Sequence, residues 1–382
     1  MKNPLISGYA TREATETYTK TFGKECAPGH YSDFLNIHLQ LSSIGIGTFP
    51  GGASDEVDAN YAEIISRALQ NGINVIDTGA HYRYGRSMQA AGEGVRRALE
   101  AGVARDQIFL VSKGGFLAFK DGPPQDFDAW FDAEIIKTGL GVKQDLTKAH
   151  LISPQYIGFQ LELSRQMMGV ETLDAFLIDQ PEVHIPVIGK NNLNQKLEKV
   201  FVVLEQAVKD KKLRYYGIST FNGFRVETDD PLFQSITSMQ GHAEKAAKLV
   251  WQDEQAKHHF KVVQMPFNQV MLEGFTRFSH ATGHGNIAST IQAAFQLKVY
   301  LMASHTMFKG HLAQQCTDTV MQALPQLEND AQRALQFNRS TPGLGTSLVG
   351  VSTPTHLDDV LAVAKIPPME KTEYLKMYQK AE

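Results

Sequence analysis

An aspartate, a tyrosine and a lysine follow two neighbouring apolar runs of the sequence, and together they suit proton transfer. Asp77 ends the run GINVID, Tyr82 lies in the loop behind it, and Lys113 ends the next run, IFLVSK. A buried carboxylate keeps a neighbouring ammonium group charged, and that charge stabilises phenolate and lowers the pKa of a tyrosine beside it. We therefore predict that Tyr82 donates a proton near neutral pH, with Lys113 and Asp77 tuning its acidity.

Each of these residues also has an ordinary structural explanation. Asp77 suits the capping of a loop, Tyr82 suits packing, and Lys113 suits a salt bridge. A lysine at the end of a barrel strand is also suited to a Schiff base with a carbonyl substrate. Taken singly, the three residues therefore leave these alternatives open.

The elements that must position these residues are short apolar runs, which alternate with longer amphipathic stretches from Leu41 onward. This alternation is typical of strand–helix units around a parallel sheet. The eight runs span Ile44–Thr48, Asn74–Asp77, Ile108–Ser112, Ala175–Asp179, Tyr215–Ser219, Val262–Met265, Val299–Ala303 and Ser347–Val351. No GxGxxG motif follows the first run. The pattern therefore favours an α/β fold of the closed (β/α)8 TIM-barrel type over an open doubly wound sheet.

The first connection shows the helical half of this repeat. The stretch DANYAEIISRALQNG has apolar residues at helical spacing and ends at Asn71 and Gly72. A glycine at this place is typical of a helix C-terminus that leads into the next strand.

We expect residues 1–40 to form an N-terminal extension and residues 41–382 to form a single barrel domain. Two long segments, Leu117–Pro154 and Val270–Ser289, follow strand ends and should lie on the C-terminal face. Their aromatic residues are candidates for lining a substrate pocket, and the alternative is that they only pack these loops onto the barrel. They are Phe127, Trp130, Phe131, Phe275 and Phe278.

Composition excludes several classes of function. The chain has 382 residues and a net charge of -4, without a basic stripe for nucleic acid. Cys26 and Cys316 are far apart, so neither a disulfide framework nor a metal site is indicated. No signal peptide and no run of about 18 apolar residues occurs, so we expect no membrane partner and a cytoplasmic location. The expected partner is a small molecule, and the oligomeric state stays open.

Several motifs in order resemble the aldo-keto reductase family between Leu41 and Val363. They read GINVIDTGAHYRYGRS, VSKGGF, LDAFLIDQPE, YYGISTFNGFR, VVQMPFNQ and RSTPGLGTSLVGVSTPTHLDDVL. The resemblance implies reduction of a carbonyl group by NAD(P)H. It also implies a catalytic tetrad of Asp, Tyr, Lys and His, whose first three members fall on Asp77, Tyr82 and Lys113.

The fourth member departs from the family, because Asp179 stands where the resemblance leads us to expect a histidine. A histidine there orients the carbonyl by a hydrogen bond, and a carboxyl group can do so only when protonated. Burial at an apolar barrel mouth raises a carboxyl pKa and favours that neutral form. The related steroid 5β-reductases have a glutamate here, which suggests reduction of a conjugated C=C bond as an alternative. His81 and His184 are alternative sources of an imidazole.

The resemblance also implies the residues that contact a nicotinamide cofactor. NADP is the cofactor that it implies, and NAD is the alternative. Ala303 stands where the family has an aromatic residue under the nicotinamide ring. Ser352, His356 and Val360 stand where the family has basic and amide residues that contact the cofactor. The residues expected to contact the cofactor are Ser219, Thr220, Gln264, Ser304, Gly350, Ser352, Thr353 and His356.

The prediction is an oxidoreductase that reduces the carbonyl of a small organic substrate, with Tyr82 as proton donor and Asp179 in place of the histidine. Enone reduction is the alternative within redox enzymes. A redox-inactive barrel that only binds a ligand, or that catalyses a non-redox step, is the alternative from another class.

Overall fold

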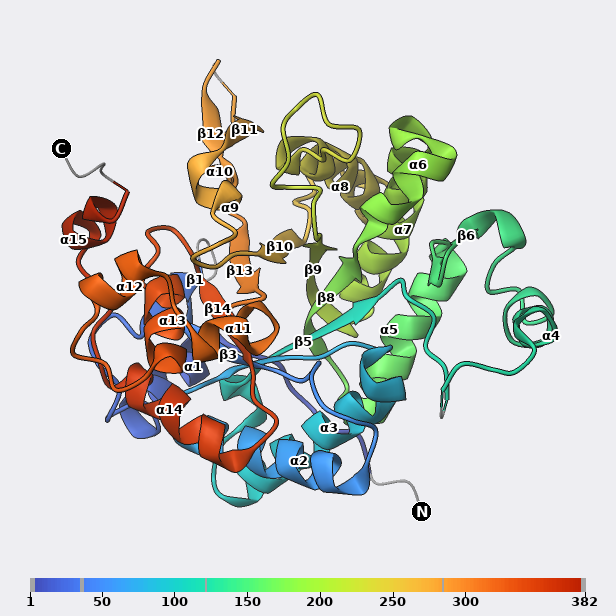
Figure 1. The fold of residues 1–382 in the computed structure, drawn as a ribbon. Coiled ribbons are helices and arrows are strands. Elements are labelled where there is room, and N and C mark those ends of the chain that lie inside the picture. The colour runs from blue at the N-terminus through green and yellow to red at the C-terminus, as the bar shows by residue number, and fades with distance from the viewer. Residues whose placement is uncertain (1–3, 35–37, 121, 284, 379–382) are drawn as a thin grey trace.

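The computed structural model describes residues 4–34, 38–120, 122–283 and 285–378, and the predicted runs form one closed barrel of parallel strands. The barrel strands are β3 (Ile44–Gly47), β4 (Val75–Asp77), β5 (Phe109–Gly114), β8 (Leu173–Asp179), β9 (Leu213–Ser219), β10 (Phe260–Pro266), β13 (Tyr300–Ser304) and β14 (Thr346–Gly350). Strand β14 pairs with β3, which closes the ring (Figure 1). The predicted (β/α)8 TIM barrel is confirmed.

The strands are apolar along their length because both of their faces are covered. Every residue of β5 and of β8 is buried, as expected for parallel strands between a filled interior and an outer layer of helices. The inner layer includes Val75, Phe109, Leu177 and Met302. The barrel centre is therefore packed, and only the ends of the strands are free to build a site.

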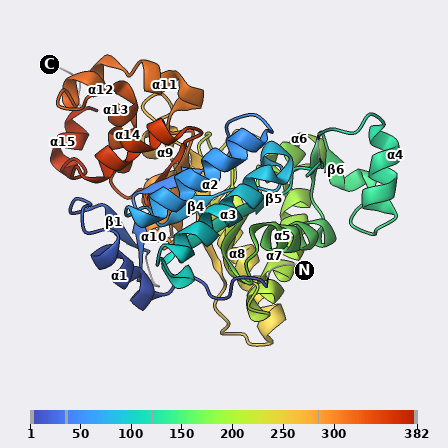
Figure 2. The same cartoon turned by 90° about the horizontal axis from the view of Figure 1, so that it is seen from below.

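The outer layer consists of helices that surround the barrel (Figure 2). They include α2 (Asp55–Gln70), α3 (Arg86–Glu100), α5 (Pro154–Met168), α7 (Lys190–Lys209), α8 (Ile236–Trp251), α10 (Thr290–Gln296), α13 (Asp330–Arg339) and α14 (Pro354–Ala364). Helix α2 begins where the Ser54 hydroxyl accepts a hydrogen bond from the Val57 amide, and it ends at Asn71. Gly72 follows with φ of +94°, as the sequence predicts.

The N-terminal segment covers the opposite end of the barrel from the predicted site. It contains α1 (Arg12–Thr21) and a hairpin of β1 (Tyr31–Phe34) and β2 (Leu39–Ser42). Leu39 and Leu41 join the apolar cluster of the barrel interior. The Asp174 carboxylate accepts hydrogen bonds from the Ala10 amide and from Arg105, both at under 3 Å. This segment therefore closes the floor of the barrel. Strand β2 runs across the predicted boundary at residue 40.

The long connection after β5 forms a small unit of its own, which projects from the barrel (Figure 1). It contains α4 (Phe127–Phe131), a π-helical turn (Asp132–Ile136), β6 (Leu146–Thr147) and β7 (His150–Leu151). Phe131 is buried in a local cluster, against which Phe127 and Trp130 pack. None of the three lines the main cavity. These aromatic side chains therefore hold the loop together, and the prediction that they line a substrate pocket is wrong.

The second long connection ends in the projecting hairpin of β11 (Phe278–Ala281) and β12 (Ile287–Ser289). Phe278 is 60% exposed, and Phe275 packs against Tyr374 and Tyr378. These two aromatic residues also lie outside the cavity lining.

Short helices complete the outer layer. They are α6 (Ile185–Ile188), α9 (Glu273–Thr276), α11 (His311–Gln314), α12 (Asp318–Ala323) and α15 (Lys371–Lys376), with 3-10 turns at Tyr82–Gly85, Arg105–Gln107, Lys143–Asp145, Pro181–His184 and Phe308–Gly310. In the described part of the chain, no helix is long and apolar enough to cross a membrane.

Candidate active site

The candidate catalytic residues lie at the carboxyl ends of the barrel strands. Asp77, Asp179 and Ser219 are the last residues of β4, β8 and β9, and Lys113 is the last but one of β5. Parallel strands bring these ends to one rim. A cavity of about 1140 Å³ opens there, and Asp77, Tyr82 and Asp179 contribute to its wall. The barrel topology therefore brings the four predicted catalytic residues together.

A buried ion pair lies beneath Tyr82. The Lys113 ammonium contacts the Asp77 carboxylate and also donates a hydrogen bond to the Thr78 carbonyl at 3.2 Å. The same Nζ atom lies 4.9 Å from the centroid of the Tyr82 ring. Lys113 is 0% exposed. Burial by itself lowers the pKa of Lys113, but Asp77, Tyr82 and Asp179 together raise it, so the ammonium group stays charged.

The pKa of Tyr82 shifts in the opposite direction from the one expected from the sequence. Burial raises this pKa above its usual value, and the Lys113 charge lowers it only in part, because the Asp77 carboxylate also acts against the phenolate. The expectation of a lowered pKa is therefore wrong for the protein without ligand. The phenol stays protonated at neutral pH, which is the form that a proton donor needs.

The loop that carries Tyr82 has an unusual backbone. Arg83 and Tyr84 have φ values of 49° and 61°, in the left-handed region that non-glycine residues seldom adopt. The Arg83 guanidinium donates a hydrogen bond to the Gly52 carbonyl at 2.8 Å and pairs with Asp58. Strained backbone of this kind persists where surrounding contacts hold it. Arg83 therefore ties the Tyr82 loop to the loop that follows β3.

Asp179 is a buried carboxyl group with few compensating partners. Burial raises its pKa above the usual range, and the Lys113 charge offsets only part of this effect. The nearest imidazole nitrogen, His81 Nε2, lies 3.8 Å from its Oδ2 atom. That distance is too long for a direct hydrogen bond.

A chain of hydrogen bonds lies behind Asp179 and does not reach the cavity. His150 Nε2 lies 2.6 Å from the Asp179 carbonyl, His150 Nδ1 lies 2.8 Å from His184 Nε2, and Thr147 Oγ1 lies 3.0 Å from His184 Nδ1. His150 comes from the long connection after β5, so this connection supports the end of β8. His184 is buried and does not line the cavity. It is therefore not the substitute imidazole considered from the sequence.

Ser219 and Gln264 connect the two carboxyl groups. Gln264 Nε2 donates to Asp77 Oδ1 at 3.1 Å, and the Ser219 hydroxyl donates to Gln264 Oε1 at 3.2 Å. The Thr220 amide donates to the Gln264 carbonyl at 2.9 Å. These three residues and Ser304, which the sequence assigns to cofactor binding, all contribute to the cavity wall.

The cavity extends to the beginning of helix α14. Gly350, Ser352, His356 and Val360 line this end. Thr353 is the N-cap residue of α14, its side chain caps no helix amide, and it lies outside the cavity lining. The first turn of a helix carries free N–H groups that favour anions. This end of the cavity therefore suits a phosphate group.

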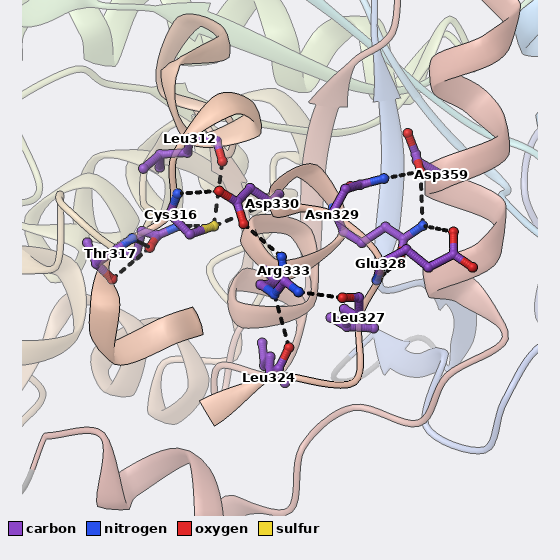
Figure 3. Close-up of polar contacts among 12 residues, drawn as sticks. Leu312, Cys316, Thr317, Leu324, Leu327, Glu328, Asn329, Asp330, Arg333 and Asp359 are labelled. Carbon is purple, nitrogen blue, oxygen red and sulfur yellow. Dashed lines mark hydrogen bonds and ion pairs between the residues drawn. The ribbon is translucent and has the colours of Figure 1, made fainter. Parts of the chain in front are cut away.

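A second wall at this end was missed from the sequence. Asn329 and Asp359 both line the cavity, and Asn329 donates to Asp359 at 2.7 Å. Figure 3 shows how the segment before α13 is held: Asp330, the first residue of α13, accepts a hydrogen bond from the Cys316 amide at 3.1 Å, and Arg333 donates one to the Leu324 carbonyl at 3.1 Å. The only sequence signal was the spacing of His356 and Asp359, which places them on one helix face. The position of Asn329 had no local signal.

No group of three or more His, Cys, Asp or Glu side chains is arranged to hold a metal ion among residues 4–34, 38–120, 122–283 and 285–378. The polar groups of the cavity instead suit an organic molecule that carries an amide and a phosphate.

Known proteins are similar to this chain in sequence. The model of the Aldo/keto reductase family matches residues 43–382. An uncharacterized oxidoreductase of Schizosaccharomyces pombe is 28% identical over 212 residues, which cover 53% of this chain and 51% of the relative. The chain thus spans about half the length of this curated relative.

Solved structures show the same fold. An aldo-keto reductase of Bacillus halodurans, in its holo form, matches with a TM-score of 0.60 at 16% identity and covers 92% of this chain and 96% of its own. An aldo/keto reductase of Klebsiella pneumoniae in complex with NADP and acetate matches with a TM-score of 0.58 at 16% identity, over 91% of this chain and 94% of its own. The match of the family model over most of the sequence, on a closed barrel with this strand order, shows that the chain belongs to the aldo/keto reductase family.

Proposed function

We propose that this protein reduces the carbonyl group of a small organic substrate with NAD(P)H, and that Tyr82 donates the proton. One observation carries the proposal. Tyr82 lies on the wall of a large cavity, with the charged ammonium of Lys113 at 4.9 Å from its ring and Asp77 paired to that ammonium. The ammonium stabilises the phenolate that remains after proton transfer.

The residues of the cavity fit a nicotinamide dinucleotide. Ser219 and Gln264 offer a hydroxyl and an amide for the carboxamide, and the first turn of α14 offers free amides for a phosphate. NADP is the proposed cofactor and NAD the alternative, in line with the NADP-bound relative from Klebsiella pneumoniae. When bound, the cofactor supplies the hydride. Tyr82 transfers its hydroxyl proton to the substrate oxygen and regains one from solvent.

Asp179 is proposed to act as a neutral acid that hydrogen-bonds the same oxygen. Two buried carboxyl groups lie near a single ammonium, and Asp77 has the direct contact with it and a further hydrogen bond from Gln264. Two carboxylates that share one buried cation cannot both be stabilised as anions. Asp179 is therefore the group that keeps its proton near neutral pH.

Enone reduction is a second candidate, and the presence of two hydroxyl donors favours it. Tyr82 and a protonated Asp179 would both polarise the oxygen of an enone, which increases the positive character of the carbon at its conjugated end. The same two donors also serve a simple ketone. Comparison of a saturated ketone with its enone distinguishes the two reactions.

The test is cofactor oxidation measured by absorbance, with NADPH and NADH, against aldehydes, saturated ketones and enones. We expect one cofactor molecule to be oxidised for each substrate reduced. Saturable cofactor binding without oxidation by any of these substrates would favour the redox-inactive alternative. Absence of cofactor binding up to about 1 mM, an affinity of only ~4 kcal/mol, would refute the reductase proposal altogether.

A further inference from the structure

His81 is the residue directly before the proposed proton donor, and it lines the same cavity. Its ring lies 4.7 Å from the Tyr82 ring and 4.9 Å from the Phe116 ring, with both distances taken between centroids. The mechanism proposed above makes no use of it. The imidazole packs against both rings, which limits its orientation.

The two nitrogen atoms of this imidazole have different surroundings. Nδ1 is buried and has no hydrogen-bond partner among the described residues. Nε2 is the atom nearest to Asp179, at 3.8 Å from Oδ2. A neutral imidazole carries one N–H group, and a buried N–H without an acceptor is costly. The proton therefore belongs on Nε2, where an acceptor can reach it.

The separation of Nε2 and Oδ2 suits a shared partner. A direct hydrogen bond between them would need a shorter distance. An oxygen atom placed about 2.9 Å from each of them, the usual length of an N–H···O contact, would lie between them. His81, Asp179 and Tyr82 all line this cavity, and the His81 ring packs against the Tyr82 ring, so a substrate oxygen in the cavity can face all three groups.

We propose that His81 is a further catalytic residue, which donates a hydrogen bond from Nε2 to the substrate oxygen and forms a two-pronged clamp with Asp179. This inference rests on the proposed reduction of a carbonyl group. The clamp stabilises negative charge on the oxygen as the carbon is reduced, and no bond of the imidazole is made or broken. Tyr82 remains the group that loses a proton.

Burial and the nearby Lys113 charge keep His81 neutral. Lys113, Asp179 and Tyr82 face it from β5, β8 and its own loop, and His150 lies behind Phe116. Burial and the Lys113 charge lower the pKa of His81 to about 3. His81 should then act as a neutral donor, and its titration should leave no step in the rate profile above about pH 5.

Two substitutions distinguish the contribution of the His81 N–H group from that of its aromatic ring. His81→Phe keeps an aromatic ring between Tyr82 and Phe116 but removes the N–H, and His81→Gln places an amide N–H near the position of Nε2. With NADPH and 4-nitrobenzaldehyde as the probe, we expect His81→Phe to lower kcat/KM about 100-fold, as for one oxyanion donor. We expect His81→Gln to stay within about tenfold of wild type. His38→Phe, at an exposed histidine outside the cavity lining, is the control.

Two readouts keep this inference separate from the proposed function. Cofactor affinity, measured by fluorescence, should be the same in wild type and His81→Phe. Imidazole 15N NMR should show His81 neutral and protonated on Nε2 between about pH 5 and about pH 8. A His81→Phe enzyme within about threefold of wild type, about 0.7 kcal/mol, would overturn the clamp, as would a proton on Nδ1. An inactive wild type would refute the reductase, and the NMR result would still decide the tautomer.

Discussion

Lys113 is the single buried cation between two carboxyl groups, and this determines the protonation of the site. Its ammonium contacts Asp77, and it opposes the rise of the Asp179 pKa only from a distance. The proposed neutral form of Asp179 in the folded protein differs from the same residue in the unfolded chain, which ionises at its ordinary pKa. Folding stability must therefore depend on pH through this residue.

The first prediction concerns the stability of Asp179→Asn. Because the folded pKa of Asp179 is raised, its favourable contribution is complete below the unfolded pKa and is lost as pH rises through the folded pKa. Asn cannot ionise, so the variant should gain stability relative to wild type as pH rises from about 4 to about 8. Urea unfolding across this range measures the difference. A constant difference would mean that Asp179 is ionised in both states.

The second prediction concerns Tyr82→Phe, which removes the phenol hydroxyl and little volume. We expect kcat/KM to fall by about 10²–10⁴-fold, the usual contribution of a positioned proton donor. Cofactor affinity should change little, because Tyr82 contributes to the cavity through its ring. Tyr84→Phe is the matched control, since Tyr84 belongs to the same loop but is 41% exposed. Loss of less than about tenfold in Tyr82→Phe would place the acid elsewhere.

At the scale of elements, the first turn of α14 influences whether the far end of the cavity favours a negatively charged group. Ser352 and His356 line this end of the cavity, and Asp359 lines it one turn further along α14. Asp359 is held in place by Asn329 at 2.7 Å and Gln332 at 2.9 Å. A carboxylate near a ribose favours a free hydroxyl over a phosphate. The helix N-terminus favours a phosphate, so the two effects oppose each other.

The third prediction follows from this opposition. The affinities for NADPH and NADH should differ by less than about a thousandfold, ~4 kcal/mol. Ser352→Lys should shift the ratio toward NADPH by about tenfold, because it adds a cation to this wall. Thr355→Lys is the control, since Thr355 is exposed on the same helix but does not line the cavity. Fluorescence titration with both cofactors measures the ratio. An equal shift in both variants would indicate a general charge effect only.

At the scale of the whole molecule, buried histidines make the fold sensitive to acid. Burial, with Arg339 nearby, lowers the pKa of His30 to about 3, and burial next to His184 lowers the pKa of His150 to about 3. His30 lies at the floor of the barrel beside Gly72 and Ser43, and His150 lies at the mouth. Neutral imidazoles therefore help to join both the N-terminal segment and the long β5 connection to the barrel.

The fourth prediction is a loss of stability on acidification. A histidine with a lowered folded pKa contributes stability above its unfolded pKa of about 6.5 and loses it as pH falls toward the folded value. Each such group should cost about 1.6 kcal/mol between pH 6.5 and pH 5. His150→Gln should therefore show a weaker dependence on pH in urea unfolding than wild type. His38→Gln should not, because the His38 side chain is 55% exposed. Parallel curves for wild type and His150→Gln would contradict the prediction.

The sequence by itself determined the barrel and the position of its reactive residues. The strands are visible because a parallel strand buried on both faces is apolar along its length, which is a local property. Asp77 and Lys113 stand out because they lie at the ends of such runs, and strand ends meet at one rim. Asp179 stands out because it replaces the histidine of the family that the sequence resembles. The role of the glycine after α2 could also be predicted from local sequence, since this glycine follows a helix whose apolar spacing is visible in the sequence.

Only the tertiary structure decided how these residues behave. The direction of the Tyr82 pKa depends on how far the barrel mouth excludes water, and no residue spacing records that. The wall of Asn329 and Asp359 joins residues that are 30 positions apart. The sequence of the connection after β5 is the same whether its aromatic side chains line a pocket or pack on one another, so sequence alone does not distinguish the two roles. Periodicity identifies which side chains are buried, but the partner that buries them is set by chain closure over long separations.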